Sequence, residues 1–269
     1  MSKPKSKIKK IVLICLGIIL ALILIIAISA AVSSKKNVKA MNKAIDDAVS
    51  LISQRYNVTS VPIDEYEQVK VYGVMKFHVK QYYVEDIGNL SIMKINMGVM
   101  QMATMVLTPQ DKNLPMVSAD YMYMLGSRKS YFEFYDLVEF KDEEYNSLLS
   151  QLQNMKGPYS DLKDIKMDKA WYDDLKTFSM YKSGKTSDDE ALEQMLMDGM
   201  EIYLNAADKL PELTDTQKHR KNEITKEYAN NLITKGGVST DAFKKSLGKD
   251  TTRDFFSKVL FGTEKIDLL

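Results

Sequence analysis

The chain has 269 residues and a mass of 30.7 kDa, and its 45% hydrophobic and 27% charged residues are typical of a globular protein. The formal charge of +1 hides an asymmetry, because residues 1–36 carry seven basic and no acidic residues, whereas the remainder carries 30 basic and 36 acidic residues. An acidic domain lacks the basic surface that binds DNA or RNA, so nucleic acid is excluded as a partner.

The chemistry of cysteine and histidine is nearly absent from this chain. Its one cysteine, Cys15, lies in an apolar N-terminal run, so the rest of the chain has no disulfide and no Cys nucleophile. His78 is flanked by apolar residues on an alternating segment and is expected at the surface, and His219 belongs to a charged helix face. We therefore expect no metal site and no protein-held cofactor.

Residues 11–32 form a run of 22 residues without a charge. At about 1.5 Å per residue, a helix of this length covers the ~30 Å hydrocarbon layer of a bilayer. The basic tail, residues 1–10, favours a cytoplasmic N-terminus, which predicts a single-pass protein of the cell membrane with its domain outside the cytoplasm. The alternative is a cleaved signal peptide ending near Ser29-Ala30-Ala31, although the run is longer than a usual signal segment.

The chain after this run divides into a helical link, a sheet and a helical region. Residues 33–60 contain an amphipathic helix over 36–56 and are predicted to join the membrane segment to a domain over 61–269. From about residue 69 to 140 the pattern alternates, which predicts a meander of about five antiparallel strands.

Helical patterns fill most of the rest. They predict a helix over 142–155, a looser stretch around Trp171 and Phe178, and two short helices over 239–247 and 250–261. Two capping boxes, Ser187–Glu190 and Thr214–Gln217, predict helices that run to about residues 210 and 235. Strands gathered in one part of the chain and helices in the others indicate a single α+β domain.

Two segments resemble a known family. Leu114-Pro115-Met116-Val117-Ser118-Ala119-Asp120, between predicted strands, looks like the core of the ferredoxin-dependent bilin reductases, and the run from Phe243 to Phe261 is similar to that family's last two helices. The resemblance spans about residues 69–262. It implies a three-layer α/β/α sandwich with a central antiparallel sheet, preceded here by the predicted transmembrane helix, and a linear tetrapyrrole held between the sheet and the C-terminal helices.

The resemblance also implies a chemistry. Such enzymes reduce their pigment by one-electron steps from ferredoxin, and side chains supply the protons, without a flavin, haem or metal. Asp120 matches the family's central aspartate and is the predicted proton donor; the alternative is an aspartate bonded to nearby backbone amides. Met102, Met116, Tyr121 and Tyr123 are predicted to line the ligand, although core packing explains methionines and tyrosines on strands as well.

Several family positions differ in this chain. The position of the histidine that pairs with the aspartate falls at Ala103. An acidic position on the strand before falls at Ser91, with Glu85 near enough to supply it in a shifted register. A second aspartate falls at Gly236-Gly237, with Asp241 a few residues later.

These differences favour a membrane-tethered, non-catalytic or diverged module that binds a flat apolar ligand or a protein partner. The alternative is an oxidoreductase that reduces a linear tetrapyrrole with Asp120 as proton donor. Ferredoxin is a candidate partner only for a cytoplasmic domain. Arg128-Lys129 is the one basic pair on the predicted turns of the sheet, and the acidic remainder of the chain would repel an acidic ferredoxin.

Overall fold

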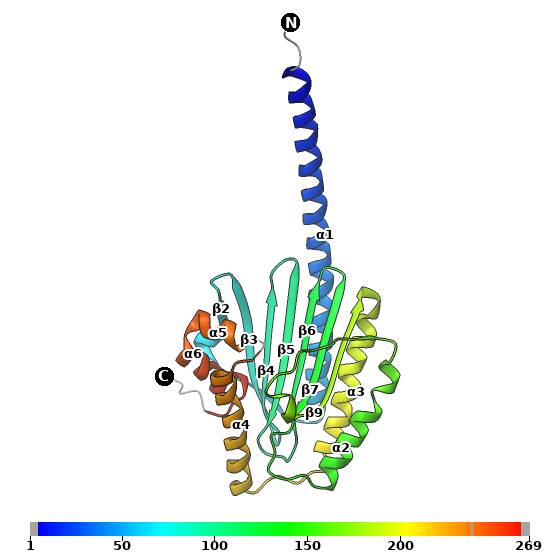
Figure 1. The fold of residues 1–269 in the computed structure, drawn as a ribbon. Coiled ribbons are helices and arrows are strands. Elements are labelled where there is room, and N and C mark those ends of the chain that lie inside the picture. The colour runs from blue at the N-terminus through cyan, green and yellow to red at the C-terminus, as the bar shows by residue number, and fades with distance from the viewer. Residues whose placement is uncertain (1–4, 238, 265–269) are drawn as a thin grey trace.

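A computed structural model describes the backbone of residues 5–237 and 239–264, and the described side chains begin at residue 18 and leave out residues 22, 23 and 26. The centre of this part is an antiparallel sheet of nine strands in the order β1-β3-β4-β5-β6-β7-β9-β8, with β2 also paired to β3 (Figure 1). The strands are β1 (Val58–Val61), β2 (Gln68–Val71), β3 (Met75–Val84), β4 (Gly88–Asn96), β5 (Met100–Pro109), β6 (Met116–Met124), β7 (Ser127–Tyr135), β8 (Lys163–Asp164) and β9 (Lys176–Lys185).

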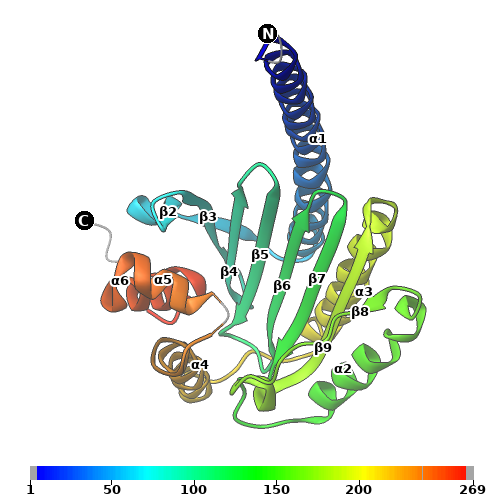
Figure 2. The ribbon, with the colours of Figure 1, turned by 45° about the horizontal axis from the view of Figure 1, so that its top comes forward.

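Helices cover both faces of the sheet (Figure 2). On one face lie α1 (Lys5–Ser53), α2 (Glu143–Asn154) and α3 (Asp189–Ala207). On the other lie α4 (Asp215–Lys235), α5 (Thr240–Leu247) and α6 (Lys249–Asp254), and α6 continues into a π-helical segment, Phe255–Leu260. Each face has its own apolar core, so the predicted α/β/α sandwich with a central antiparallel sheet is confirmed.

Helix α1 belongs to the domain over its last five turns. Five apolar side chains at helical spacing are at most 3% exposed and pack in the first core: Met41, Ala44, Ile45, Ala48 and Ile52. The segment after the helix forms strand β1 on the edge of β3. Residues 33–60, predicted as a link before the domain, therefore pack as part of it, because the apolar face of this helix needs the sheet as its partner.

A search of the described residues for a helix both long and apolar enough to cross a bilayer finds none. The predicted anchor, residues 11–32, lies partly outside this description, because the side chains of residues 11–17, 22, 23 and 26 are not described.

The other elements follow the sequence pattern with three exceptions. The predicted helices over 142–155 and 214–235 are confirmed as α2 and α4, and Thr214 and Gln217 form the expected capping box. The sheet has more strands than the predicted five, and the stretch read as loose contains β9. Ser187 does not cap α3; a turn at residues 186–188 precedes the helix, and there the Asp188 carboxylate accepts the amide of Lys185 at 2.7 Å.

The two edges of the described sheet differ. The edge of β3 is shared by two strands of four residues, β1 on residues 81–84 and β2 on residues 75–78. The opposite edge ends in the two-residue strand β8. The β3 edge is therefore covered by short strands, whereas most of the ten-residue strand β9 has no described strand partner on its outer side beyond its pairing with β8 at residues 182 and 183.

Candidate functional site

The side chains of β6 alternate between the two faces of the sheet. Val117, Ala119, Tyr121 and Tyr123 point into the core beneath α1 and α3. Asp120 points to the opposite face, toward the side of α4–α6, and the pairing register places Thr104 of β5 and Tyr131 of β7 on either side of it.

A polar and partly exposed patch surrounds Asp120 on this face. We call it the Asp120 face, and it consists of Met102, Thr104, Ser118, Asp120, Met122, Tyr131, Glu133 and Tyr181, all partly exposed. Helices α5 and α6 lie over β2–β4, and α4 packs against the lower ends of β5–β7, so no helix lies over the middle of β5–β7 on this side (Figure 2). Lys129, in the same alternation, adds an exposed cation at the upper end of the patch.

Asp120 is held by two hydroxyl groups. Thr104 Oγ1 donates to Asp120 Oδ1 at 2.5 Å, and Ser118 Oγ donates to Oδ2 at 3.1 Å. The pKa of Asp120 is raised to about 6. Burial is the largest cause and the negative charge of Glu133 adds to it, whereas the bonds from Thr104 and Ser118 act in the opposite direction. A carboxyl group with this pKa exchanges its proton near neutral pH, as a general acid or base must.

A second carboxylate, Glu133, lies in the next row of the same face. Tyr135 and Tyr181 donate to its two oxygens at 2.6 and 2.5 Å, and Lys176 Nζ lies 2.8 Å from Oε1. Lys176 also pairs with Asp173 at 2.7 Å, and the opposing carboxylates raise the pKa of this lysine against the effect of its burial. The two tyrosine hydroxyls and the Lys176 ammonium therefore hold the Glu133 carboxylate in place.

Aromatic side chains close the lower end of the Asp120 face. Tyr228 of α4 lies 5.4 Å from Tyr135 and 6.0 Å from Trp171, measured between ring centroids. The Trp171 indole donates to the carbonyl of Gly236 at 2.7 Å, which ties the segment before β9 to the end of α4. A flat ligand on the Asp120 face would meet this aromatic wall.

The structure brings together only some of the predicted ligand residues. Met102 lies on the Asp120 face beside Met122, and Met116 points the same way but is 2% exposed at the end of β6. Tyr121 and Tyr123 are 1% exposed on the opposite face, where Tyr121 donates to the carbonyl of Leu192. Because strand side chains alternate, neither tyrosine lines a site that contains Asp120, and this part of the prediction is corrected.

The residues at the positions where the family has further proton-donating side chains lie away from Asp120 or are otherwise paired. Ala103, assigned to the missing histidine, faces the first core, and Thr104 is the residue of β5 that contacts Asp120. Ser91 is fully buried and donates to the carbonyl of Val259. Asp241 is exposed and paired with Lys244, which lowers its pKa, so it is no proton donor near neutral pH.

The charged turn residue Arg128 has no exposed surface. Its guanidinium bonds Asp189 at 2.5 and 3.2 Å and stacks 4.3 Å from the centroid of Tyr123. The expected basic pair on the turn therefore offers only Lys129 to a partner. His78, by contrast, is exposed as predicted.

Glu133 and Thr104 were not found from the sequence. Glu133 had a signal, since a carboxylate between Phe132 and Phe134 on an aromatic strand must point away from the core. Thr104 had none, because only the pairing register places it opposite Asp120. Among the described residues, no group of three or more His, Cys, Asp and Glu side chains is arranged to hold a metal ion.

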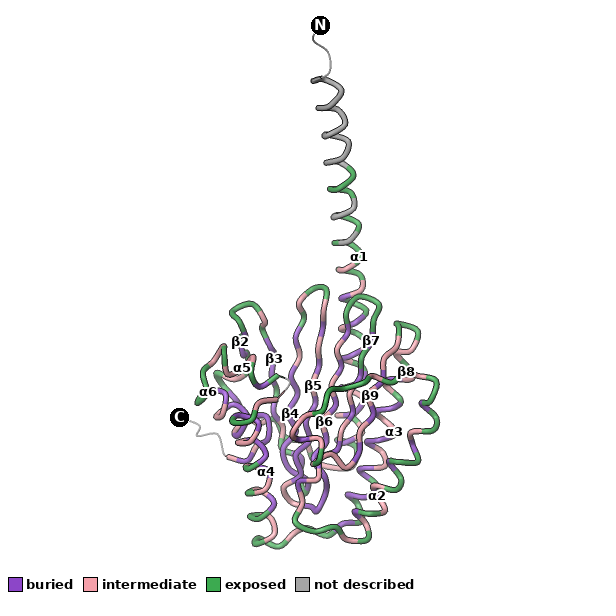
Figure 3. The backbone as a smooth tube through the Cα atoms, in the orientation of Figure 1, coloured by how far each residue is buried: buried purple, intermediate pink, exposed green. Residues whose placement is uncertain are grey.

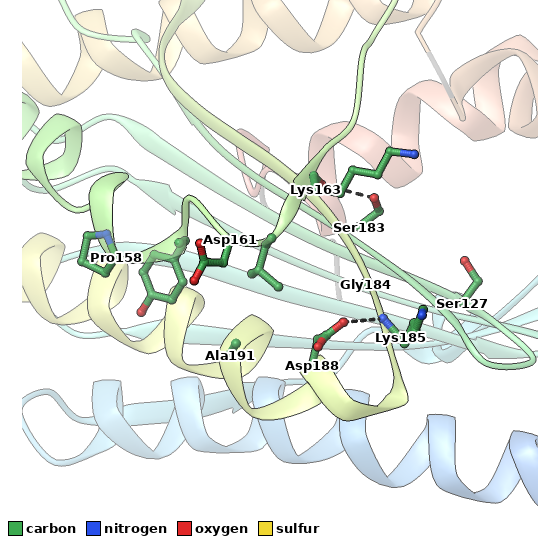
Figure 4. Close-up of a pocket in the computed structure, with 11 residues that line it drawn as sticks. Ser127, Pro158, Asp161, Lys163, Ser183, Gly184, Lys185, Asp188 and Ala191 are labelled. Atoms are coloured by element: carbon green, nitrogen blue, oxygen red, sulfur yellow. Dashed lines mark hydrogen bonds between the residues drawn. The ribbon is translucent and has the colours of Figure 1, made fainter.

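A separate hollow of about 570 Å³ lies at the β8–β9 edge, between residues 158–163 and the start of α3 (Figure 4). Its polar groups bond to one another: Ser183 Oγ donates to the carbonyl of Lys163 at 3.2 Å, and Asp188 accepts the Lys185 amide. None of the sequence-predicted site residues lines this hollow, so the candidate site is the Asp120 face.

Comparison with protein-family models finds no match, and comparison with curated proteins finds none either. Among solved structures, the chain is similar to phytochromobilin synthase from tomato, whose crystal structure was determined in complex with biliverdin. The two share 16% sequence identity at a TM-score of 0.63, over 82% of this chain and 83% of that chain. The likeness confirms the bilin-reductase-like fold.

Proposed function

We propose that this chain binds an open-chain tetrapyrrole on the Asp120 face. The observation that carries the proposal is Asp120 itself: a carboxyl group with a pKa of about 6 on a partly exposed face of the sheet. The similar fold of a protein solved with biliverdin supports the class of ligand.

The side chains of the Asp120 face suit such a pigment. A linear tetrapyrrole is flat and apolar, with pyrrole N–H donors at its centre and two propionate groups at its rim. The Asp120 carboxylate can accept from pyrrole N–H groups, and Met102, Met122 and Tyr131 offer adaptable and aromatic contact area. Lys129 offers a cation for a propionate at the same face.

A second candidate function is reduction of the bound pigment. It is favoured by the Asp120 pKa, since a carboxylic acid that is partly protonated at neutral pH can donate a proton to a reduced pigment. Reduction of one double bond takes two electrons and two protons. An external one-electron donor would supply the electrons in turn, Asp120 one proton and solvent the other. We place binding first, because the second carboxylate of the Asp120 face as described, Glu133, is already paired with Lys176 at 2.8 Å.

We also propose that residues 11–32 tether the chain to the cell membrane and that the domain lies outside the cytoplasm. The uncharged run and the basic tail of residues 1–10 support this proposal. Protease added to intact cells should then remove the domain, and a domain that survives this treatment in intact cells but not in lysed cells would place it inside. An inside location would also make ferredoxin an accessible electron donor.

Titration of the purified chain with biliverdin tests the binding proposal. We expect a shifted absorption spectrum on binding, and a changed spectrum with Asp120→Asn, because the substitution removes the carboxylate that contacts the pigment. Tyr121→Phe is the matched control, since Tyr121 lies on the opposite face and should leave the spectrum unchanged. Absence of any spectral change with the wild-type chain would reject the proposal.

The same complex distinguishes binding from reduction. After addition of a chemically reduced ferredoxin, turnover would bleach or shift the pigment band, and Asp120→Asn would abolish this change. A stable band in the wild-type complex would leave binding as the function and exclude reduction by this donor.

A further inference from the structure

Three hairpin turns lie at the end of the sheet from which α1 projects (Figure 1). They join β2 to β3, β4 to β5 and β6 to β7, and we call them the three tips: residues 72–74, 97–99 and 124–126. The strands run roughly along α1, so the tips form one end of the domain and point in the same direction as the helix.

The backbone at the three tips is coloured mostly as exposed (Figure 3), and each tip includes exposed apolar residues. Val74 is 82% exposed, Val99 is 50% exposed and Leu125 is 44% exposed, and Tyr72 and Met124 are each 53% exposed. Single exposed apolar residues are ordinary on protein surfaces, but five at the tips of three adjacent hairpins form a group at one end.

Hydrogen bonds fix two of the three tips at a definite level of α1. Ser34 Oγ donates to Asn96 Oδ1 at 3.1 Å, and Asn37 Nδ2 donates to Gln101 Oε1 at 2.7 Å, so the β4–β5 tip is tied to the helix at residues 34–37. The Leu125 amide donates to the Val99 carbonyl at 3.2 Å, which joins the next tip to it.

The exposed apolar surface of α1 begins just beyond that level. Val32 is 51% exposed, and six more described apolar side chains further along the helix are 54–61% exposed: Ile18, Ile19, Leu20, Leu24, Ile25 and Ile28. Val32 precedes Ser34 by two residues, or about 3 Å of helix rise. The tips therefore lie where the apolar part of the helix starts.

Charged residues are distributed unevenly between the two ends of the strands. Residues 68–84, 87–110 and 121–132, which contain the tips, have no Asp or Glu, whereas exposed lysines stand near this end at positions 35, 36, 76 and 129. Acidic residues gather near the opposite ends of the strands, as at Glu85, Asp86 and Glu139. The β9–α3 turn at the same end of the sheet carries Asp188, Asp189 and Glu190, of which Asp189 is paired with Arg128. The three tips themselves are apolar and have exposed lysines nearby, a composition that binds anionic lipid headgroups.

We infer that the three tips rest on a lipid bilayer and insert their apolar side chains among its headgroups, with the strands upright on the membrane. This inference rests on the proposed tether at residues 11–32, and it does not depend on pigment binding. It also places the upper end of the Asp120 face, at Met102 and Met122, next to the bilayer, from which an apolar ligand can reach the site.

Fluorescent labelling of the full chain in vesicles tests the inference. In a Cys15→Ser background, Val99→Cys and Val74→Cys each provide one exposed labelling site, and Phe140→Cys, 39% exposed beyond the far end of β7, is the matched control. The chains are reconstituted into vesicles of phosphatidylcholine and phosphatidylglycerol and labelled with a polarity-sensitive dye. We expect the dyes at 74 and 99 to shift to the blue, to lose emission to brominated lipid and to resist aqueous iodide.

Two further readouts decide the outcome: the dye at the control position, and whether the chain floats with the vesicles in a density gradient. The dye at position 140 should show none of these changes and should be quenched by iodide. If the chain floats with the vesicles but positions 74 and 99 behave like 140, the tether holds and the contact of the tips is rejected. If the chain does not float, tether and contact are both rejected, while the biliverdin titration still judges pigment binding separately.

Discussion

At the scale of single residues, the candidate site depends on which face of a strand a side chain occupies. The sequence located Asp120 within its motif and on a strand, but it could not supply the register of the neighbouring strand. Because a shift of one residue reverses the face, Ala103 was assigned where Thr104 in fact contacts Asp120. The same alternation places Tyr121 and Tyr123 on the opposite face from the site, although Tyr121 directly follows Asp120 in the sequence and Tyr123 comes two residues later.

The raised pKa of Asp120 predicts a pH-dependent contribution to stability. The native state holds this proton up to about pH 6, whereas the unfolded chain releases it near the ordinary value of 3.8. The contribution is therefore complete below about pH 4 and is lost as the pH rises through 6. At pH 8, Asp120→Asn should be more stable than the wild type by about 1–2 kcal/mol, below the ~3 kcal/mol of a fully buried group because the side chain is partly exposed.

Urea unfolding of both chains at pH 5 and pH 8 measures this effect. The difference between variant and wild type isolates Asp120, because Lys221, whose pKa burial lowers to about 7, titrates equally in both. Asp168→Asn, at an exposed aspartate, should give no such difference between the two pH values. A stabilisation by Asp120→Asn that is equal at pH 5 and pH 8 would contradict the assigned pKa.

Arg128 is expected to be structural. Arg128→Ala leaves the Asp189 carboxylate without its partner and removes the stacking on Tyr123, so the free energy of unfolding should fall by about 3 kcal/mol. Arg253→Ala is the matched control, because its pair with Asp250 is exposed, and it should change stability by less than about 0.5 kcal/mol. Similar losses for the two variants in chemical denaturation would refute this role.

At the scale of elements, local signals predicted the helices better than the strands. Helices α2 and α4 carry their own caps at Asp142 and Thr214, so a few adjacent residues define where they begin. Strand β9 was missed, because only Phe178 and Met180 mark its buried face and its partner β7 is about 50 residues earlier in the chain. Its third inward residue is Lys182, which is buried and paired with Asp164.

Substitution of the first residue in each of the two predicted capping boxes should have different effects on the free energy of unfolding. Thr214→Ala removes a side chain that accepts the Gln217 amide, so it should lower the free energy of unfolding by about 1 kcal/mol. Ser187→Ala should change it by less than about 0.5 kcal/mol, because Ser187 is exposed and bonds only the neighbouring Asp188 carboxylate. Thermal unfolding of the two variants under one condition compares them, and an equal loss would show that Ser187 also caps a helix.

At the scale of the whole molecule, the first part of α1 projects from the domain and its last part packs in the core (Figure 1). Its amphipathic pattern over residues 36–56 was evident from the sequence, but the partner of its apolar face was not, because that partner is a sheet formed far along the chain. The fold class was predictable because strands and helices are segregated in sequence. The start of the domain was not, since the uncharged run and the packed segment form one continuous helix.

Truncations separate these two roles of α1. A chain that begins at residue 33, close to the product of the alternative signal cleavage, keeps all the residues of α1 described as buried and should unfold cooperatively with unchanged stability. A chain that begins at residue 54 loses five buried apolar side chains, each worth about 2–5 kcal/mol, and should not fold, because domains are stable by only about 5–15 kcal/mol. Circular dichroism and urea unfolding measure both, and a folded 54–269 chain would show that α1 is dispensable.

The two borders of the sheet have a consequence for how copies of this chain meet. An exposed strand of full length can recruit another chain through its free backbone groups, which leads to edge-paired dimers and fibrils. Here the β3 border is divided between β1 and β2, whereas β8 pairs with only two residues of β9 at the other border. We therefore expect the β3 border to stay free of strand-to-strand self-association even at the high local concentrations of a crowded surface, and we expect any such pairing along β9.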